Sequence, residues 1–462
     1  MKLNRRQMLA GSAASLWLPR LAEAAAGAGG MQVIEPRAAE HQLAPSDYPA
    51  TRIWGYDGMA PGPEMRIAQG ERLTRRLRNG LDQPTSIHWH GIRIDNAMDG
   101  VPGLTQEAVA PGASFDYDFA LPDAGTYWYH AHAQSVEQVG RGLYGALIVT
   151  EPEPLDIDAE HVLILDDWRL QDDAQLAGDW GAPHDNSHGG RMGNFIATNA
   201  TFDLALPVEQ NARLRLRLIN AANARIFPLA LKGLEGWIVA LDGMPLASPE
   251  AVGEDFVLGP GQRADLLVDV VAEEGEEAYL VRFDRDAAAA QVSFPVTGRA
   301  ALSRRPAPAP LPPNPGQELP DLASVRALDM PIEGGAMGRL GSAMYEGAET
   351  QFRDLVGAGQ FWALGGAAGL PKTPFASAAR GETLRIRMEN QTVFPHAMHL
   401  HGMHFREVLS GGALGPMRDT LLVAGQETGE IVFEARNPGK WLIHCHMLGH
   451  AASGMVQWIE VT

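Results

Sequence analysis

The stretch Gly70-Glu-Arg-Leu-Thr-Arg-Arg-Leu-Arg-Asn79 is followed, nine positions after Asn79, by the pair His88-Trp-His90. The same arrangement returns near the other end of the chain, where Gly381-Glu-Thr-Leu-Arg-Ile-Arg-Met-Glu-Asn390 is followed by His399-Leu-His401 at the same nine-residue step. A middle copy, residues 211–220, keeps the step but reaches a segment without histidine, residues 229–232. The sequence therefore predicts one domain type used three times, with the middle copy as a scaffold.

The ends of the outer copies agree as well. Gly125-Thr-Tyr-Trp-Tyr-His-Ala-His132 matches Gly439-Lys-Trp-Leu-Ile-His-Cys-His446 position by position. In the middle copy, Leu214-Arg-Leu-Arg-Leu218 alternates apolar and polar residues, which is typical of strands with one face on a core. With 51 glycines and 32 prolines between short apolar runs, we expect a mostly β protein built of sandwiches or barrels.

The chain length and its proline-rich segments indicate the domain boundaries. A chain of 462 residues is long enough for about three domains. We place the domains at residues 31–152, 153–300 and 321–462, and we interpret residues 301–320, which are rich in proline, as a stiff extended linker.

The N-terminus resembles an export signal. Asn4-Arg-Arg-Gln7 precedes an apolar stretch that ends at Leu18 and small-residue choices for cleavage such as Ala22-Glu-Ala24. This pattern resembles a twin-arginine signal, so we assign residues 1–30 to the signal and the mature N-terminus. We expect the twin-arginine machinery as a partner, a periplasmic location and no membrane anchor once the signal is removed. The net charge of −19 disfavours nucleic acid and anionic membranes as partners.

The distribution of histidine points to metal chemistry. Ten of the fifteen histidines fall into four clusters: His88 and His90; His130 and His132; His396, His399 and His401; His444, His446 and His450. Residues two apart on a strand point to the same side, so each His-X-His pair presents two imidazoles to one cavity. Eight imidazoles gathered in this way would require cations, and imidazole suits copper, iron, nickel and zinc.

A second kind of site is predicted from the remaining ligands. His396, Cys445 and His450 supply two nitrogens and a thiolate, and Met455 supplies a weak axial thioether. This set is the blue-copper electron-transfer arrangement, and it gives the single cysteine of the chain a role. The corresponding positions of the first domain hold no such ligands, so one mononuclear site is predicted, in the third domain.

Together, the four motifs resemble those of the multicopper oxidases, which include laccases, ascorbate oxidase and bacterial copper-tolerance oxidases. The motifs are His88-Trp-His-Gly91, Tyr129-His-Ala-His132, His396-Ala-Met-His-Leu-His-Gly402 and the segment from His444 to Met455. The resemblance implies three consecutive cupredoxin-like Greek-key domains and four copper ions, one in the mononuclear (type 1) site and three in a cluster between the first and third domains.

The resemblance also implies a ligand assignment and a mechanism. It assigns the type 2 copper to His88 and His399, one type 3 copper to His90, His130 and His446, and the other to His132, His401 and His444. Cys445 would hold the type 1 copper, and electrons from a substrate oxidised near His450 would reach the cluster through its sequence neighbours, where dioxygen is reduced to water.

Asp99 is the candidate proton donor, because the family places a carboxylate beside the type 2 copper at this motif spacing. An aspartate that caps a turn is the alternative, and the two roles are compatible. Many members carry a glutamate just before the last copper-binding histidine, but this chain has Gly449 there. The second proton source is therefore unassigned.

Several other residues have weaker claims. We expect His404 to contact the metal ligands without binding metal itself, or to lie on the surface. We expect His184 and His188 to lie in a solvated loop. Met330, Met337 and Met344 recur at seven-residue spacing, which is more typical of core filling than of a substrate-metal site.

The sequence is compatible with three functions. The first is a laccase-like oxidase of phenols or aromatic amines. The second is a periplasmic oxidase of Cu(I) or Fe(II) that serves copper tolerance. The third is a copper-binding or cell-envelope protein without activity, which the complete set of ligands disfavours because a structural role would not require it.

Overall fold

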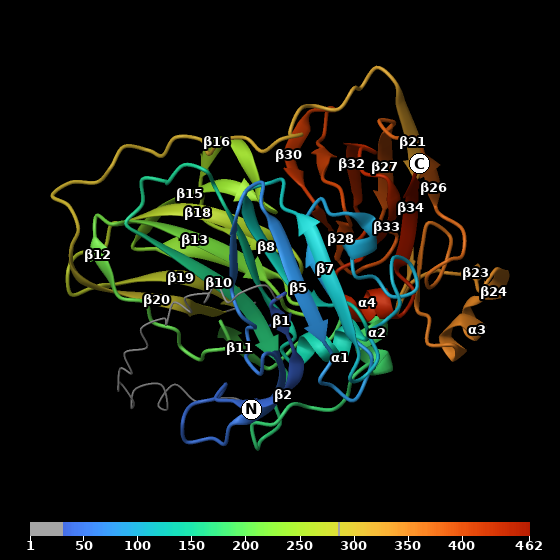
Figure 1. Ribbon diagram of the computed structural model, residues 1–462, viewed down its shortest axis with the longest axis horizontal. Coiled ribbons are helices and arrows are strands. Elements are labelled where there is room, and N and C mark those ends of the chain that lie inside the picture. Colours follow the sequence, from blue (N-terminus) through green and yellow to red (C-terminus); the bar gives the residue numbers. More distant parts are fainter. Residues whose placement is uncertain (1–30, 285–286) are drawn as a thin grey trace.

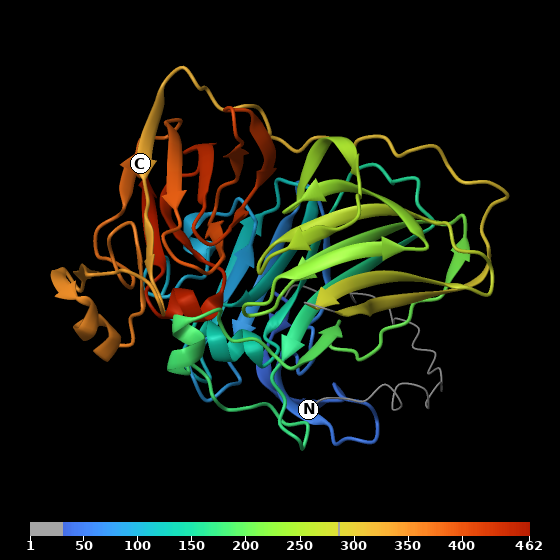
Figure 2. The same cartoon turned by 180° about the vertical axis from the view of Figure 1, so that it is seen from behind.

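The computed structural model describes residues 31–284 and 287–462, which form three domains of paired β-sheets (Figure 1). The middle domain lies on one side, the third domain on the other, and the first domain between them (Figures 1 and 2). The mostly β, three-domain prediction is confirmed. Within the described residues, no helix is long and apolar enough to cross a membrane.

The first domain contains nine strands, one short α-helix and a 3-10 turn. They are β1 (Val33–Ile34), β2 (Pro36–His41), β3 (Thr51–Tyr56), β4 (Met65–Ala68), β5 (Arg72–Arg78), β6 (Ile87–His90), the turn Asn96–Met98, β7 (Ser114–Ala120), β8 (Gly125–Ala131), α1 (Ser135–Gly140) and β9 (Tyr144–Thr150).

The middle domain has the longest strands. Its elements are β10 (Ala159–Trp168), α2 (Pro183–Ser187), β11 (Phe195–Thr198), β12 (Val208–Gln210), β13 (Arg213–Asn220), β14 (Phe227–Lys232), β15 (Leu234–Leu241), β16 (Met244–Ala251), β17 (Phe256–Leu258), β18 (Arg263–Val270), β19 (Glu277–Asp284) and β20 (Ala287–Arg299).

The third domain adds two small two-stranded sheets and two short helices to its two main sheets. Its elements are β21 (Val325–Asp329), β22 (Ile332–Gly334), β23 (Ser342–Tyr345), β24 (Ala348–Gln351), α3 (Phe352–Gly357), β25 (Trp362–Leu364), β26 (Ala376–Ala378), β27 (Thr383–Glu389), β28 (His396–Leu400), β29 (Phe405–Val408), β30 (Leu414–Arg418), β31 (Thr420–Val423), β32 (Thr428–Glu434), β33 (Gly439–Cys445), α4 (Leu448–Ala452) and β34 (Val456–Val461).

The sequence repeat corresponds to a repeated sheet topology. The orders β1-β5-β7, β10-β13-β18 and β21-β27-β32 each begin with a parallel pair and continue with an antiparallel one. The facing sheets repeat as β4-β9-β8-β6, β12-β20-β19-β14 and β26-β34-β33-β28. The histidine motifs lie on equivalent strands of the outer copies, β6 and β8 in one and β28 and β33 in the other, because the copies share one topology.

A buried asparagine explains the nine-residue step. Asn79 follows β5, donates from Nδ2 to the carbonyls of Gln83 (2.9 Å) and Val109 (2.8 Å), and accepts from the amide of Leu81 (3.0 Å). Asn220 and Asn390 make the same three contacts in their own domains. Each side chain thus fixes the loop that leads into the next strand, and in the outer domains that strand carries His-X-His.

The polar face of β13, which carries its arginines, is buried rather than exposed to solvent. Alternation predicts one buried face, yet all eight residues of the strand are buried. Arg215 and Arg217 both contact Asp265, at 2.6 and 3.1 Å, and Arg217 also donates to Thr126 of the first domain at 2.9 Å. The polar face is therefore the interface between the middle and first domains, where each guanidinium has a carboxylate partner.

The proline-rich linker crosses the outside of the middle domain, along the top of Figure 1. It is anchored by Asn314, which exchanges hydrogen bonds with the backbone of Ala124 at 2.7 and 2.9 Å. One continuous apolar cluster joins the cores of the first and third domains, whereas the middle domain has a separate core. The first and third domains are thereby held face to face.

We predict that Asn390→Ala and Asn220→Ala each destabilise the protein, because each leaves buried backbone groups unpaired at a cost of about 1–3 kcal/mol per group. Both variants should lower the midpoint of thermal unfolding. Only Asn390→Ala should also lower the metal content of the purified protein, because Asn220 lies in the domain without a histidine motif. Equal metal loss in both variants would contradict this role for Asn390.

Candidate metal centre

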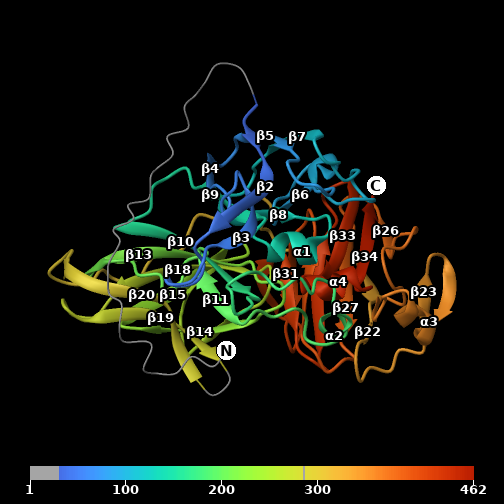
Figure 3. The same cartoon turned by 90° about the horizontal axis from the view of Figure 1, so that it is seen from below.

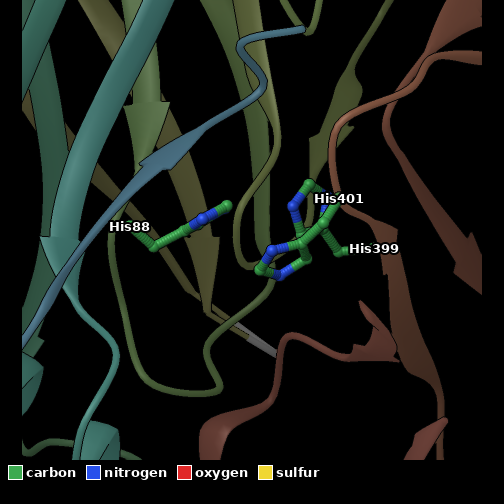
Figure 4. Close-up of side chains that lie close together, drawn as sticks. All are labelled: His88, His399 and His401. Carbon is green, nitrogen blue, oxygen red and sulfur yellow. The ribbon is translucent and has the colours of Figure 1, made fainter. Parts of the chain in front are cut away.

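Two pairs of antiparallel strands bring the histidine clusters together between the first and third domains. On β6 and β8, His88 is directly opposite His130, and on β28 and β33, His399 is opposite His444. Across the interface, the ring of His88 stacks on that of His401, with centroids 3.8 Å apart, and His90 stacks on His399 at 3.7 Å. Figure 4 shows His88 facing His399 and His401 from the opposite domain.

Six of the eight imidazoles at this interface have one nitrogen hydrogen-bonded to an oxygen acceptor. The donors are Nδ1 of His88 to Asp99 O, Nε2 of His90 to Asp419 Oδ1, Nδ1 of His130 to Ala131 O, Nδ1 of His399 to Asp419 O, Nδ1 of His401 to Asp99 Oδ2 and Nδ1 of His444 to Cys445 O. A ring that donates one N–H to such an acceptor offers a lone pair on its other nitrogen, which is the arrangement of metal-ligating histidine.

The other nitrogens point to a shared space. Those of His88, His90, His130 and His399 are buried and have no hydrogen-bond partner within the described part of the chain. Nε2 of His401 lies 3.0 Å from Nε2 of His444. Both of these rings donate from Nδ1, and burial lowers the pKa of both imidazoles, so at neutral pH two lone pairs face each other. A cation would stabilise this arrangement. The residues present therefore fit bound metal.

The predicted ligand groups can be compared with this geometry. His132, His401 and His444 offer nitrogens that all lie within 4.8 Å of one another, as do those of His88, His399 and His401. His446 lies with its ring 4.9 Å from that of His90 and 5.3 Å from that of His130. The structure thus brings all eight predicted cluster residues into one buried site.

Asp99 bridges two of the imidazoles. Its carboxylate lies 3.3 Å from Nδ1 of His88 and 3.0 Å from Nδ1 of His401, and the residue is fully buried. It also follows the 3-10 turn Asn96–Met98, where its amide donates to Asn96 O. The carboxylate thus lies against the imidazoles, as the family resemblance implied, and it caps no backbone amide of the turn within the described residues.

Asp419, just before β31, is a site residue that sequence reasoning missed. Its carboxylate lies 3.2 Å from Nε2 of His90 and 3.3 Å from Nδ1 of His399, so it mirrors Asp99 on the other side of the site. Asp419 lies outside every histidine motif, and its only sequence signal is its place just before a strand of the third copy. Tertiary structure alone brings it to the imidazoles.

The cation that neutralises Asp419 comes from the middle domain. Arg263, fully buried at the start of β18, contacts both carboxylate oxygens of Asp419. Burial alone would raise the pKa of Asp419, but Arg263 and the neighbouring imidazoles outweigh it and hold the pKa well below its usual range. The domain that lacks histidine motifs thus supplies part of the metal centre.

The mononuclear site lies next to the cluster. Sγ of Cys445 is 3.7 Å from Nδ1 of both His396 and His450, and the two Nδ1 atoms are 3.1 Å apart. Burial raises the pKa of the Cys445 thiol to about 12 and lowers the pKa of His450 to about 4. At neutral pH the imidazoles therefore offer lone pairs, and the thiol becomes a thiolate only if a cation displaces its proton. Met455 is fully buried in the apolar cluster that also contains Cys445.

The residues that pack over the mononuclear site include a segment that the sequence analysis predicted to be a solvated loop. The segment around His188, expected to be a solvated loop, accepts a 2.6 Å hydrogen bond from Nε2 of His450 through its backbone carbonyl. Trp362 lies over the other side, with its ring 4.4 Å from that of His450. A Cβ on Gly449 would lie 3.0 Å from Oδ1 of Asn186, so α2 packs closely against this position.

The weaker candidates divide between core and surface. His404 is buried, and its Nε2 lies 3.8 Å from Asp419, so it lies behind the cluster. Met330 is buried in the core, whereas Met337 and Met344 are exposed. Core filling is therefore correct for Met330 alone, because the seven-residue spacing falls on loops and strand β23 rather than on a helix.

Comparison with known proteins identifies the family. Models described as multicopper oxidase match residues 37–154, 159–303 and 347–462. The chain belongs to the multicopper oxidase family. This match confirms the predicted family and enzyme class. Multicopper oxidases are copper-binding oxidoreductases that use dioxygen.

Solved structures and curated proteins support this membership. The multicopper oxidase of Pseudomonas thermotolerans is 33% identical, with a TM-score of 0.81 over 93% of this chain and 98% of that one. Lac15, from a marine microbial metagenome, is 41% identical, with a TM-score of 0.76 over 94% and 100%. Copper resistance protein A of Pseudomonas syringae pv. tomato is 34% identical over 276 residues, 49% of this chain and 43% of that protein.

We predict that Asp419→Ala lowers the copper content of this multicopper oxidase and destabilises it by about 3–5 kcal/mol, because it leaves Arg263 buried without its partner. Metal analysis and chemical denaturation would measure both effects. Asp116→Ala is the matched control, since it removes an exposed ion pair with Arg76, and exposed ion pairs contribute little to stability. Full copper content in Asp419→Ala would show that the carboxylate does not orient the ligands.

Proposed function

We propose that this multicopper oxidase holds four copper ions and couples one-electron oxidation of a small reducing substrate to the four-electron reduction of dioxygen to water. The ligands would be those of the sequence assignment: His88 and His399; His90, His130 and His446; His132, His401 and His444; and His396, Cys445, His450 and Met455. When bound, the copper ions supply the redox chemistry.

The observation that carries this proposal is the covalent adjacency of the two sites. Cys445 belongs to the mononuclear site, and its neighbours His444 and His446 belong to the cluster. The chain also links the sites by a 2.9 Å hydrogen bond from Nδ1 of His444 to the carbonyl of Cys445. Electron transfer between the sites therefore needs to cross only a few bonds.

For the electron donor we propose phenols or aromatic amines, as in laccases, with Cu(I) or Fe(II) as the second candidate. The second candidate is supported by His450, whose outward nitrogen already donates to His188 O and so cannot bond an organic substrate directly. The name of copper resistance protein A, and the net charge of −19, which attracts cations, also support a metal donor.

We propose that Asp99 supplies protons to dioxygen reduction. The reaction consumes four protons as well as four electrons, and imidazoles that hold metal do not supply them readily. Asp99 is a buried carboxylate that contacts imidazoles of both outer domains. A carboxylate within hydrogen-bond reach of the site is suited to proton transfer.

We also propose that the protein works in the periplasm after twin-arginine export. The motif that supports this proposal lies in residues 1–30, outside the described part of the chain.

The proposal is tested by Cys445→Ser. A hydroxyl does not replace the soft thiolate, so the intense blue absorption and oxygen consumption with any donor should both be lost. The cluster ligands remain, so most of the copper should stay bound. A variant that is still blue and active would contradict the assignment.

A second test separates proton supply from ligand orientation. Asp99→Asn keeps an oxygen that can accept the hydrogen bond from His401, but it removes the titratable proton. Copper content and anaerobic reduction by substrate should be unchanged, while the return of the blue band after mixing with oxygen becomes several-fold slower in stopped-flow measurements.

Asp99→Ala is the matched comparison, and it should lose copper as well, because His401 then has no acceptor. Reoxidation of Asp99→Asn at the unmutated rate would mean that Asp99 only orients ligands.

A further inference from the structure

The solvent side of the mononuclear site is formed by a segment of the middle domain. Helix α2 lies against α4 (Figure 3), and His188, which follows α2, accepts the hydrogen bond from Nε2 of His450 at 2.6 Å. The segment is anchored at Asn186, whose carbonyl accepts from Nε1 of Trp362 at 2.5 Å and from Ser453 at 3.2 Å. The peptide group of His188 is therefore in direct hydrogen-bond contact with the imidazole of His450.

Two imidazoles, those of His184 and His188, lie in this segment. His184 and His188 are four residues apart, and their rings are nearly parallel at 10°, with centroids 4.1 Å apart. His184 is exposed and His188 is half-buried. A His pair at this spacing is a common metal-binding arrangement in helices. Here α2 ends at Ser187 and His188 follows it, yet the two rings still lie side by side.

The tautomer of His188 suits a metal ligand. Its Nδ1 lies 3.0 Å from the carbonyl of His184, and because a carbonyl only accepts, the N–H is on Nδ1. Nε2 then carries a lone pair. This is the arrangement seen in six of the cluster imidazoles, in which a backbone or carboxylate oxygen fixes the tautomer and leaves the other nitrogen for metal.

The surroundings favour a soft cation over a hard one. The two aspartates of this segment, Asp179 and Asp185, are both engaged by Arg169, so neither carboxylate is free. Two exposed methionines lie in segments that contact this one. Cε of Met192 would lie 3.3 Å from a Cβ on Gly189, and Ala336, which precedes Met337, donates from its amide to Ser187 O at 2.7 Å. Imidazole with thioether suits Cu(I), whereas Fe(II) would gain more from carboxylates.

We propose that His184 and His188 bind Cu(I) as a reducing substrate, a site that deepens the proposed oxidase function and rests on it. Each Cu(I) loses one electron and leaves as Cu(II), and the electron passes through the His188 peptide and its hydrogen bond to His450. Four Cu(I) ions, one dioxygen and four protons then give four Cu(II) ions and two waters. The middle domain thus supplies the substrate site although it lacks the family's histidine motifs.

The first experiment measures binding without turnover. Ag(I) has the charge and ligand preferences of Cu(I) but is not oxidised under these conditions, so we would titrate silver nitrate into the copper-loaded protein in chloride-free buffer and follow the heat. We expect one Ag(I) per chain, and an affinity at least about tenfold weaker in His184→Ala and in His184→Ala/His188→Ala. His161→Ala, on β10 of the same domain, is the control and should bind as the unmutated protein does.

The second experiment measures turnover by oxygen consumption. In His184→Ala kcat/KM for Cu(I) should fall at least about tenfold, while kcat/KM for a phenol changes less than about threefold. The blue absorption should be unchanged, because the backbone carbonyl of His188 remains.

The outcomes separate the site from the enzyme. Unchanged Ag(I) affinity in both variants would overturn the site, and so would equal losses for Cu(I) and phenol, which would mean that the pair only holds the segment in place. A larger loss for the phenol would make the stacked rings an aromatic docking surface and would also overturn it. If the copper-loaded unmutated protein oxidises no donor, the proposed function fails, while the Ag(I) titration still decides the site.

Discussion

Eight imidazoles between two domains, seven of them buried, impose the constraint on which the rest of this structure depends. Six of them donate from one nitrogen to an oxygen acceptor, and a cation would satisfy the other nitrogen, because an unpaired buried polar group is costly. The facing Nε2 atoms of His401 and His444, 3.0 Å apart, show the constraint most directly. These rings are held at one interface by the strand register, by the hydrogen bonds that Asn79 and Asn390 make to the loops before the histidine strands, and by the shared apolar core of the outer domains.

The middle domain lacks the histidine motifs yet contacts both metal sites. Arg263 neutralises Asp419 behind the cluster, and the His188 carbonyl holds His450 at the mononuclear site. The arginines of β13 fasten this domain to the first one through buried ion pairs. The middle copy, although it lacks the histidine motifs, therefore has more than a structural role, because Arg263 neutralises a carboxylate at one site and the His188 segment covers the other.

Much of the site could be predicted because the repeat places its ligands in register. His88 and His399 lie at the same step after Asn79 and Asn390, so equivalent strands carry them to one interface. Asp99 was predictable only through resemblance to the family. Asp419, Arg263 and His188 were not, because each belongs to another segment or domain and meets the imidazoles only through folding.

The sequence by itself determined the strand pattern, the threefold repeat and the set of imidazole and thiolate side chains proposed as ligands, because alternation and fixed spacing are local properties that survive in every copy. The tertiary structure decided what lies around those ligands. Whether a polar face such as that of β13 meets water or another domain, and whether the nitrogen of His450 meets a substrate or a carbonyl, depends on how domains pack, and local sequence does not encode that packing.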